Sequence, residues 1–227
     1  ADPAPDRSEQ CGADGLRCVR WVEEQLAGWE DHFGCDHRAV FPTVYRLLTR
    51  EIRLVLEDDP GVFDDPAGLG FEAVAFYELY EQMITDHLAG RPVPDAWQVA
   101  MDAANEGDWT AGHDMLLSIS AHVQRDMPHA MVRVGLAIPD GSSRKPDHDR
   151  GNRILFDAYQ PIVQAVAERY DPFMADVAAI PVVDDVGAQQ LVAGWREGVW
   201  RNAESLATTQ GTEAHAVSVA AVEANAR

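Results

Sequence analysis

Residues 71–87 read FEAVAFYELYEQMITDH, and this stretch decides the fold class of the 227-residue chain. Its aromatic and aliphatic residues recur every three to four positions, which is the period of one face of an α-helix. The segment AGRPVP, residues 89–94, then ends the run with Gly and Pro. We therefore expect a helix that packs one apolar face against a core.

The same period recurs on both sides of this stretch. The apolar residues that mark it are Val19, Val22, Leu26 and Trp29 in one segment and Val40, Val44, Leu47, Leu48, Ile52 and Val55 in the next. Further helices are expected over residues 95–105, 109–126, 127–136, 149–170 and 184–206, with a weak terminal helix within 210–227. No period-two run of β-branched residues is found. The sequence predicts an all-α protein, a single irregular helical bundle of about seven or eight helices in one domain, residues 1–227.

The composition narrows the class of partner. The formal net charge is −20, from 38 acidic against 18 basic side chains, and such a surface repels phosphate backbones. We therefore expect a small-molecule substrate and no nucleic acid. No apolar run reaches the roughly 20 residues that a membrane helix needs, so no membrane span is expected. Gly-rich phosphate loops are absent from the sequence, which argues against a nucleotide cofactor.

The N-terminal segment, residues 1–35, holds all three cysteines of the chain. We expect Cys11 to pair with Cys35 and tie this segment to the body, and three reduced thiols are the alternative. The chain starts with ADPAP, which resembles the remainder after cleavage at a small-residue site. We therefore expect a secreted or exported protein, with a cytoplasmic location as the alternative.

The segment SISAHVQRDMPHAM, residues 118–131, carries His and Asp side chains at helical spacing. His122 and Asp126 are one turn apart, about 40° around the helix axis, so they face the same side. A pair at this spacing can chelate one metal ion or act as an acid–base pair. His129 joins them only if the helix continues through Pro128. The alternative starts a new helix there, with Asp126 as its N-cap and His122 as a hydrogen-bonded core residue.

Two further polar groups stand where predicted helices begin. They are Asp36, His37 and Arg38 in the first group and Asp147, His148, Asp149 and Asn152 in the second. An acidic residue at a helix start often does no more than cap the helix and complement its dipole. However, metal sites in helical bundles are commonly assembled from several helices. We therefore expect these groups to converge with His122 and Asp126 on one buried polar site.

Three blocks of the sequence carry a family resemblance. They are CDHRAVFPTVYRLLTREI (residues 35–52), AHVQRDMPHAM (residues 121–131) and DHDRGNRIL (residues 147–155). In this order they resemble the hallmark blocks of an actinobacterial domain-of-unknown-function family, whose central block usually reads Ala-His-Ile-Asn-x-Asp-Leu-Pro. The chain keeps His122, Asp126 and Pro128 but has Val123 and Gln124 in place of Ile and Asn. The resemblance spans most of the chain and implies that the blocks are important, without implying a particular reaction.

The run HVQRDMPH, residues 122–129, is also similar to part of the zinc-dependent phospholipase C and single-strand nuclease superfamily. Proteins of that superfamily bind metal through a His-x-x-x-Asp pair that is followed by Pro and His. The present run has one residue fewer before the Pro, and no second His-x-x-x-Glu block follows. This resemblance implies that a divalent metal such as zinc binds at His122 and Asp126.

Three functional hypotheses follow. The first is a metal-dependent hydrolase of a small molecule, in which a carboxylate activates water beside the ion. Its candidate metal ligands are His122, Asp126 and His148, and its candidate catalytic residues are Asp36, Arg38, Asp149 and Asn152. The second is a metal-free tailoring enzyme, such as a cyclase or lyase, that uses the same residues as general acid and base beside an apolar pocket. The third is a non-catalytic secreted helical protein.

Overall fold

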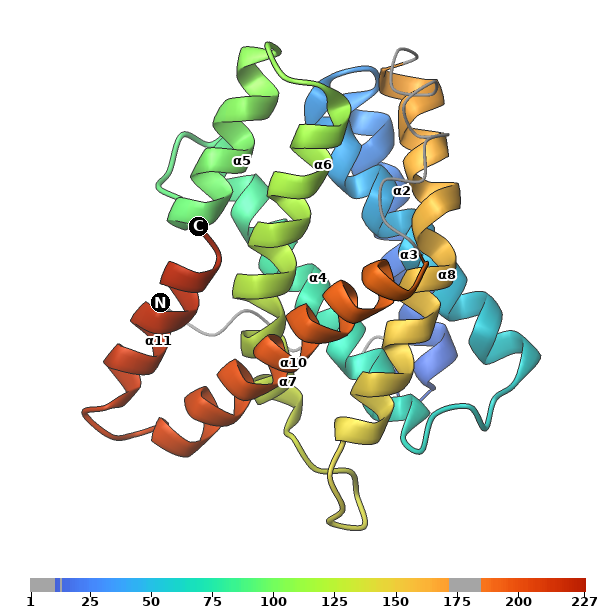
Figure 1. Cartoon of the computed structure of the whole chain (residues 1–227), viewed down its shortest axis with the longest axis vertical. Coiled ribbons are helices and arrows are strands. Elements are labelled where there is room, and N and C mark those ends of the chain that lie inside the picture. Colours follow the sequence, from blue (N-terminus) through green and yellow to red (C-terminus); the bar gives the residue numbers. More distant parts are fainter. Residues whose placement is uncertain (1–10, 13, 172–184) are drawn as a thin grey trace.

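The computed structural model describes residues 11–12, 14–171 and 185–227 (Figure 1). Within these residues the protein is all-helical, and the sheet-like pairing is one isolated β-bridge between Ala137 and Ser143. The predicted fold class is thus confirmed. None of the described helices combines the length and the apolar character that crossing a membrane requires.

The described residues form a series of helices and helical turns. In chain order they are α2 (Gly15–Phe33), the 3₁₀ turn η1 (His37–Ala39), α3 (Val40–Asp58), α4 (Pro66–Leu88), α5 (Asp95–Glu106), α6 (Ala111–Ser120), the π-helix η2 (Ala121–Asp126), α7 (Met127–Val134), α8 (Lys145–Tyr170), α10 (Asp185–Thr209) and α11 (His215–Asn225). The helix α2 packs against α3 and α4, and α10 packs against both α7 and α8 (Figure 1).

Glycines set the close approach between α2 and α4. A side chain at Gly15 would place its Cβ atom 1.8 Å from the carbonyl oxygen of Pro66, where α4 begins. A Cβ atom at Gly70 would lie 2.6 Å from the Cα atom of Gly15. Both positions therefore require the absence of a side chain, which brings α2 and α4 into direct backbone contact.

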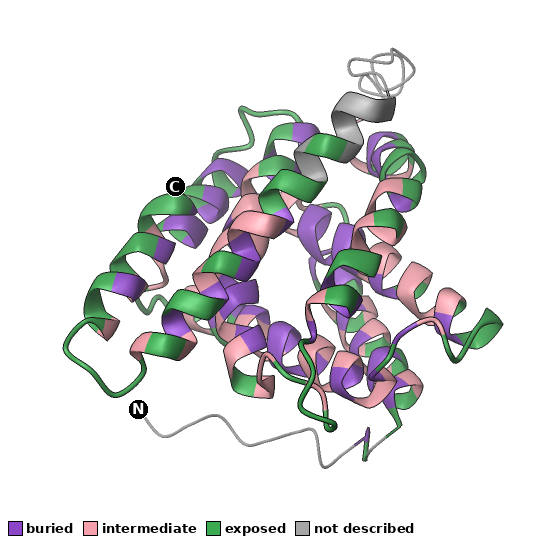
Figure 2. Ribbon diagram, turned by 60° about the horizontal axis from the view of Figure 1, so that its bottom comes forward, coloured by how far each residue is buried: buried purple, intermediate pink, exposed green. Residues whose placement is uncertain are grey.

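The core lies along the faces of the helices that point toward one another (Figure 2). In α4, the apolar stripe expected from the sequence is buried, with Tyr77 at 1% and Tyr80 at 1% exposure. Trp97, from α5, is fully enclosed. Burying each large aromatic side chain stabilises the fold by about 2–3 kcal/mol, so α4 and α5 anchor the centre of the bundle.

The helix does not break at Pro128, and here the sequence-based N-cap interpretation is wrong. The backbone N–H of Met127 bonds to the carbonyl oxygen of His122, five residues back, which defines a π turn. This wide turn carries α6 into α7 without interruption, and Asp126 keeps helical dihedral angles and caps nothing. A π turn leaves some backbone groups without their usual partners, so a residue without an N–H group fits there at reduced cost.

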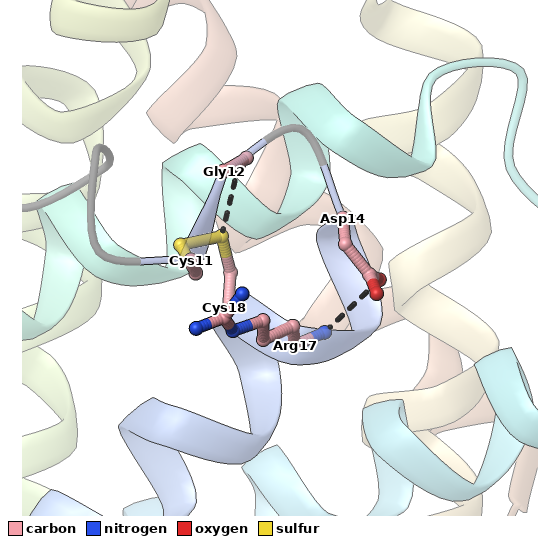
Figure 3. Close-up of a disulfide and its surroundings, with 5 residues drawn as sticks. All are labelled: Cys11, Gly12, Asp14, Arg17 and Cys18. Atoms are coloured by element: carbon pink, nitrogen blue, oxygen red, sulfur yellow. Dashed lines mark hydrogen bonds between the residues drawn. A yellow bond between two sulfur atoms is a disulfide. The ribbon is translucent and has the colours of Figure 1, made fainter.

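The expected disulfide partner of Cys11 is also wrong. Cys11 bonds to Cys18, in the first turn of α2 (Figure 3). Cys35 is free and exposed. Asp14 caps α2 between them by accepting the backbone N–H of Arg17 at 3.2 Å. The disulfide still ties the start of the described chain to the body, because Cys11 and Cys18 are both buried.

The C-terminal half follows the expected order with shifted boundaries. The helix α8 starts at Lys145, four residues before the expected start, and continues through Pro161. The helix predicted over residues 184–206 is α10, whose first described residue is Asp185, so Asp184 lies outside the described residues. The predicted terminal helix is present as α11.

Candidate functional site

His122 and Asp126 form a directly bonded pair on η2. The His122 Nδ1 atom lies 2.9 Å from an Asp126 carboxylate oxygen, and the two residues are 2% and 0% exposed. Asp126 also accepts hydrogen bonds from the Trp97 indole at 2.8 Å and from the Arg125 guanidinium. A carboxylate can only accept, so Nδ1 of His122 is the donor and Nε2 carries the free lone pair.

The surroundings of this pair set its charge state. Burial lowers the pKa of His122 and outweighs the opposing effect of Asp126, which keeps the imidazole neutral. For Asp126, burial works to raise the pKa, but the hydrogen bonds from His122 and Arg125 outweigh it and hold the pKa below its usual value. The result is a neutral histidine with one fixed tautomer beside an ionised carboxylate.

Aromatic rings enclose the His122 imidazole. The Phe76 ring stacks on it with centroids 3.5 Å apart and an interplanar angle of 11°, and the Tyr45 ring lies 4.8 Å away. Phe41, Tyr80 and Trp97 complete the enclosure. The Nε2 atom of His122 and the hydroxyl of Tyr45 are both buried, and neither has a hydrogen-bond partner among the described residues.

A cavity of about 100 Å³ lies on the other side of this aromatic wall. Phe76 and Tyr45 each contact His122 and also line the cavity. More than half of the remaining lining residues are apolar, including Ile52, Leu69 and Leu155. A concave, mainly apolar space with a few polar groups is the usual form of a small-molecule site.

The three sequence blocks that carry the family resemblance all reach this cavity. The first block contributes Tyr45, Thr49 and Ile52, the second contributes Met127, and the third contributes His148 and Gly151, among others. These blocks belong to α3, to the start of α7 and to the start of α8. The predicted meeting of the two polar groups with His122 and Asp126 is not found at this cavity. Of the residues in those groups only Asp147 and His148 line the wall, and neither His122 nor Asp126 does.

Glu72, on α4, places a carboxylate in the cavity wall. Glu72 is partly buried, and its side chain lines that wall. Its carboxylate makes no hydrogen bond or ion pair with the residues that the structure describes. Burial raises the pKa of Glu72, and the nearby charges of Arg196 and Arg144 offset part of that rise.

Arg196, on α10, holds His148 in place beside the cavity. Its guanidinium donates to the His148 carbonyl oxygen at 2.6 Å and to the His148 Nδ1 atom at 3.0 Å. The other ring nitrogen, Nε2, donates to the Arg196 carbonyl oxygen at 3.0 Å. Burial, reinforced by the charge of Arg196, lowers the pKa of His148 to about 3, and burial lowers the pKa of Arg196 to about 10. At neutral pH, His148 is therefore neutral and Arg196 is charged.

The other two charged groups of the wall have partners. Asp147 accepts the backbone N–H groups of residues 64 and 65 at 2.8 and 2.9 Å and pairs with Arg150. Arg144 lies 2.9 Å from the Asp65 carboxylate and donates to the backbone carbonyls of residues 135 and 137. The Arg144–Asp65 contact is an ion pair without hydrogen-bond geometry, since that guanidinium nitrogen has no hydrogen-bond acceptor.

The remaining predicted site residues are held by their own neighbours. Asp36 caps η1, as its position suggested, and forms an ion pair with Arg38 at 2.8 Å. Asp149 pairs with Lys145 at 2.9 Å on the surface, and Asn152 has a buried side-chain oxygen without a partner. No hydrogen bond or ion pair among the described residues joins this set to His122 or Asp126.

The predicted metal ligands are not grouped around one point. In the parts of the chain that the structure describes, no three His, Cys, Asp or Glu side chains stand close enough together to hold a metal ion. His122 and Asp126 bond to each other, and both ring nitrogens of His148 are engaged by Arg196. A bound divalent metal such as zinc stays a prediction.

Sequence reasoning missed Glu72 and Arg196. Glu72 lies one helical turn before Phe76, so it interrupts the apolar face of the stretch that decides the fold. Arg196 lies three and four residues before Val199 and Trp200, which are both buried. A charged residue on the apolar stripe of a helix was thus the available signal in both cases.

Comparison with known proteins identifies a family. Residues 19–227 match a family described as "Family of unknown function (DUF5995)". No curated protein and no solved structure matches the chain. Since the match covers far more than half of the chain, the protein belongs to this family of unknown function.

Proposed function

We propose that the protein is an enzyme that transfers protons to or from a small, mainly apolar molecule held in the cavity between α3, α4 and α8. In this proposal the carboxylate of Glu72 is the catalytic base. The observation that carries the proposal is the carboxylate of Glu72, which lines an apolar cavity and has no partner among the described residues. This is the metal-free alternative of the sequence analysis, with a different residue as its base.

The environment of Glu72 suits acid–base chemistry. A general acid or base works best when its pKa lies near the working pH, and burial moves the pKa of Glu72 upward in that direction. Perturbed carboxyl groups in clefts are frequent at active sites, although ion-pair networks also perturb them. The absence of a protein partner leaves the Glu72 carboxylate available for a substrate proton.

Arg196 supports the same chemistry through its charge. It is 7% exposed and forms no ion pair with a carboxylate among the described residues. A fixed cation in a low-dielectric wall stabilises negative charge that develops on a substrate as a proton leaves. His148 and Met127 hold Arg196 in place, so the charge is preorganised.

In this proposal, the His122–Asp126 pair positions the wall of the cavity. Its imidazole supports Phe76, which lies between the pair and the cavity. The predicted metal-dependent hydrolase would instead require His122 and Asp126 to bind a common ion. Elemental analysis of protein purified without chelator tests that alternative, because a stoichiometric divalent metal would favour it over the metal-free enzyme.

Export is proposed as well. Disulfides persist in oxidising compartments and are rare in the cytosol, so the Cys11–Cys18 bond supports the predicted secreted or exported location.

A turnover assay tests the proposed function. Wild-type protein is incubated with a pool of small molecules, and mass spectrometry follows which compounds are converted. We expect Glu72→Gln to slow the conversion by about a hundredfold or more, because it removes the proton-transferring group while keeping the size of the side chain. Glu24→Gln, at an exposed position on α2, is the matched control and should convert the compound at the wild-type rate. Conversion by Glu72→Gln at the wild-type rate would refute the proposal.

A further inference from the structure

Two of the four charged residues in the cavity wall are neutralised by pairing. Arg144 pairs with Asp65 at 2.9 Å. Asp147 pairs with Arg150, which also pairs with the exposed Asp64, and Asp147 accepts two backbone N–H groups as well. Arg144 and Asp147 thus each have a charged partner within the protein and do not need one from a ligand.

The other two charged residues are opposite in sign and do not form an ion pair. Glu72 has no partner among the described residues, and the Arg196 guanidinium bonds to the carbonyl oxygen and Nδ1 of His148 and contacts the sulfur of Met127. The charge of Arg196 nevertheless acts on Glu72, and that of Glu72 acts on Arg196. The wall itself holds two cations, Arg144 and Arg196, and two anions, Glu72 and Asp147, so the formal charge of the residues that line the cavity is zero.

We infer that the ligand of this cavity is a neutral molecule with a compact apolar body and one hydroxyl or amide N–H group that donates a hydrogen bond to Glu72. This inference rests on the proposed function and names the chemical class of its substrate. A charged ligand would lose its hydration on entering this mainly apolar space, and no uncompensated charge of opposite sign would offset the loss.

The size and polarity of the ligand follow from the same wall. A dry cavity of about 150 Å³ accommodates benzene, so 100 Å³ suits a body of roughly four non-hydrogen atoms. Ile52, Leu69 and Leu155 supply apolar contacts for that body. An ionised carboxylate only accepts hydrogen bonds, so the polar end of the ligand must donate to Glu72. A hydrogen bond to a charged acceptor strengthens binding by about tenfold to a hundredfold.

Four probes that share one branched apolar body test the inference. They are isoamyl alcohol, isovaleramide, isovalerate and isoamylammonium, of which the first two are neutral, the third is an anion and the fourth is a cation. Each is titrated into the full chain at neutral pH, and binding is followed by protein NMR. We expect the alcohol and the amide to bind about tenfold or more tightly than either charged probe.

A single substitution should change this selectivity. Glu72→Gln leaves the charge of Arg196 uncompensated, so the anion isovalerate should bind about tenfold more tightly to the variant than to wild type. The neutral probes should weaken by about tenfold, because a neutral amide oxygen replaces a charged acceptor. Glu24→Gln should leave all four affinities unchanged. Leu155→Phe, which fills the cavity, should abolish binding of every probe, and Ile52→Phe is a second filling variant in case the first does not fold.

The outcomes separate this inference from the proposed function. Preference of the wild type for the cation or the anion would overturn the inference, because the wall would then carry a net charge, and the turnover assay would be unaffected. Failure of all four probes to bind would overturn it as well. Unchanged turnover in Glu72→Gln would instead refute the proposed function, whatever the probes show.

Discussion

The Nδ1 atom of His122 lies 2.9 Å from the Asp126 carboxylate, one turn away on a helix that widens into π geometry between them. Asp126 also accepts hydrogen bonds from Trp97 and Arg125, and Arg125 extends the network to Glu223 on α11 at 2.8 Å. A single buried carboxylate thus joins η2 to α5 and, through Arg125, to the C-terminal helix.

Replacing Asp126 should lower the stability of the fold. Asp126→Ala removes the acceptor from the indole of Trp97, the imidazole of His122 and the guanidinium of Arg125, so we expect the free energy of unfolding to fall by about 3–5 kcal/mol. Urea denaturation followed by circular dichroism measures the loss. Asp149→Ala, at an exposed surface pair with Lys145, is the control and should cost less than half as much. Equal losses in the two variants would show that the network does not anchor the helices.

The π turn explains why this pair was predictable from the sequence while its setting was not. The spacing of four residues places His122 and Asp126 on one face in either helix type, and the structure confirms their contact. Pro128, however, is read most simply as a helix break. Only the packing of η2 against its neighbours favours a continuous wide turn, and sequence periodicity does not report that packing.

The lowered pKa of His148 predicts how the free energy of unfolding depends on pH. Its pKa is about 3 in the folded protein and about 6.5 in the unfolded chain, so the unfolded chain binds the proton first as the pH falls. His148 thus contributes nothing to the pH dependence above about pH 6.5 and destabilises the fold progressively between about pH 6.5 and pH 3. Lowering the pH from about 7 to 5 should cost about 2 kcal/mol through this residue.

His148→Gln checks this contribution by urea denaturation at the two pH values. Burial also lowers the pKa values of His122 and His129, so these residues likewise destabilise the fold as the pH falls. The pKa values of Glu72 and Asp114 are raised, so these two residues stabilise the fold as the pH falls. The variant should be less stable at neutral pH, because the bonds with Arg196 are lost, but its loss on acidification should be smaller than that of wild type. A loss as large as that of wild type would contradict the assigned charge state of His148.

Mass spectrometry can test the Cys11–Cys18 disulfide directly. In unreduced protein, a peptide containing Cys11 should be linked to one containing Cys18, and Cys35 should react with iodoacetamide. A Cys11–Cys35 link, the pairing expected from the sequence, would contradict the structure. The sequence places all three cysteines in one segment, but only the fold of α2 decides which two sulfurs meet.

The cavity could not be predicted from the sequence. Helical periodicity was sufficient for the fold, because apolar spacing along each helix is a local property. The position of Glu72 opposite the start of α8 depends on how α4 packs against distant helices, and that is a tertiary property. Asp36 and Asp149 were singled out for their neighbours in sequence, and the structure gives both of them local partners.

The central claim is that Glu72 is a carboxyl group without a partner among the described residues, in an environment that suits proton transfer. The pKa of Glu72 tests that claim most directly. Carbon NMR of the glutamate side chains, assigned with Glu72→Gln, follows the titration of this residue. We predict that the pKa of Glu72 lies above its ordinary value of 4.5, and above that of the exposed Glu24 measured in the same experiment, because burial disfavours the charged form. A pKa of Glu72 at or below that of Glu24 would contradict the account.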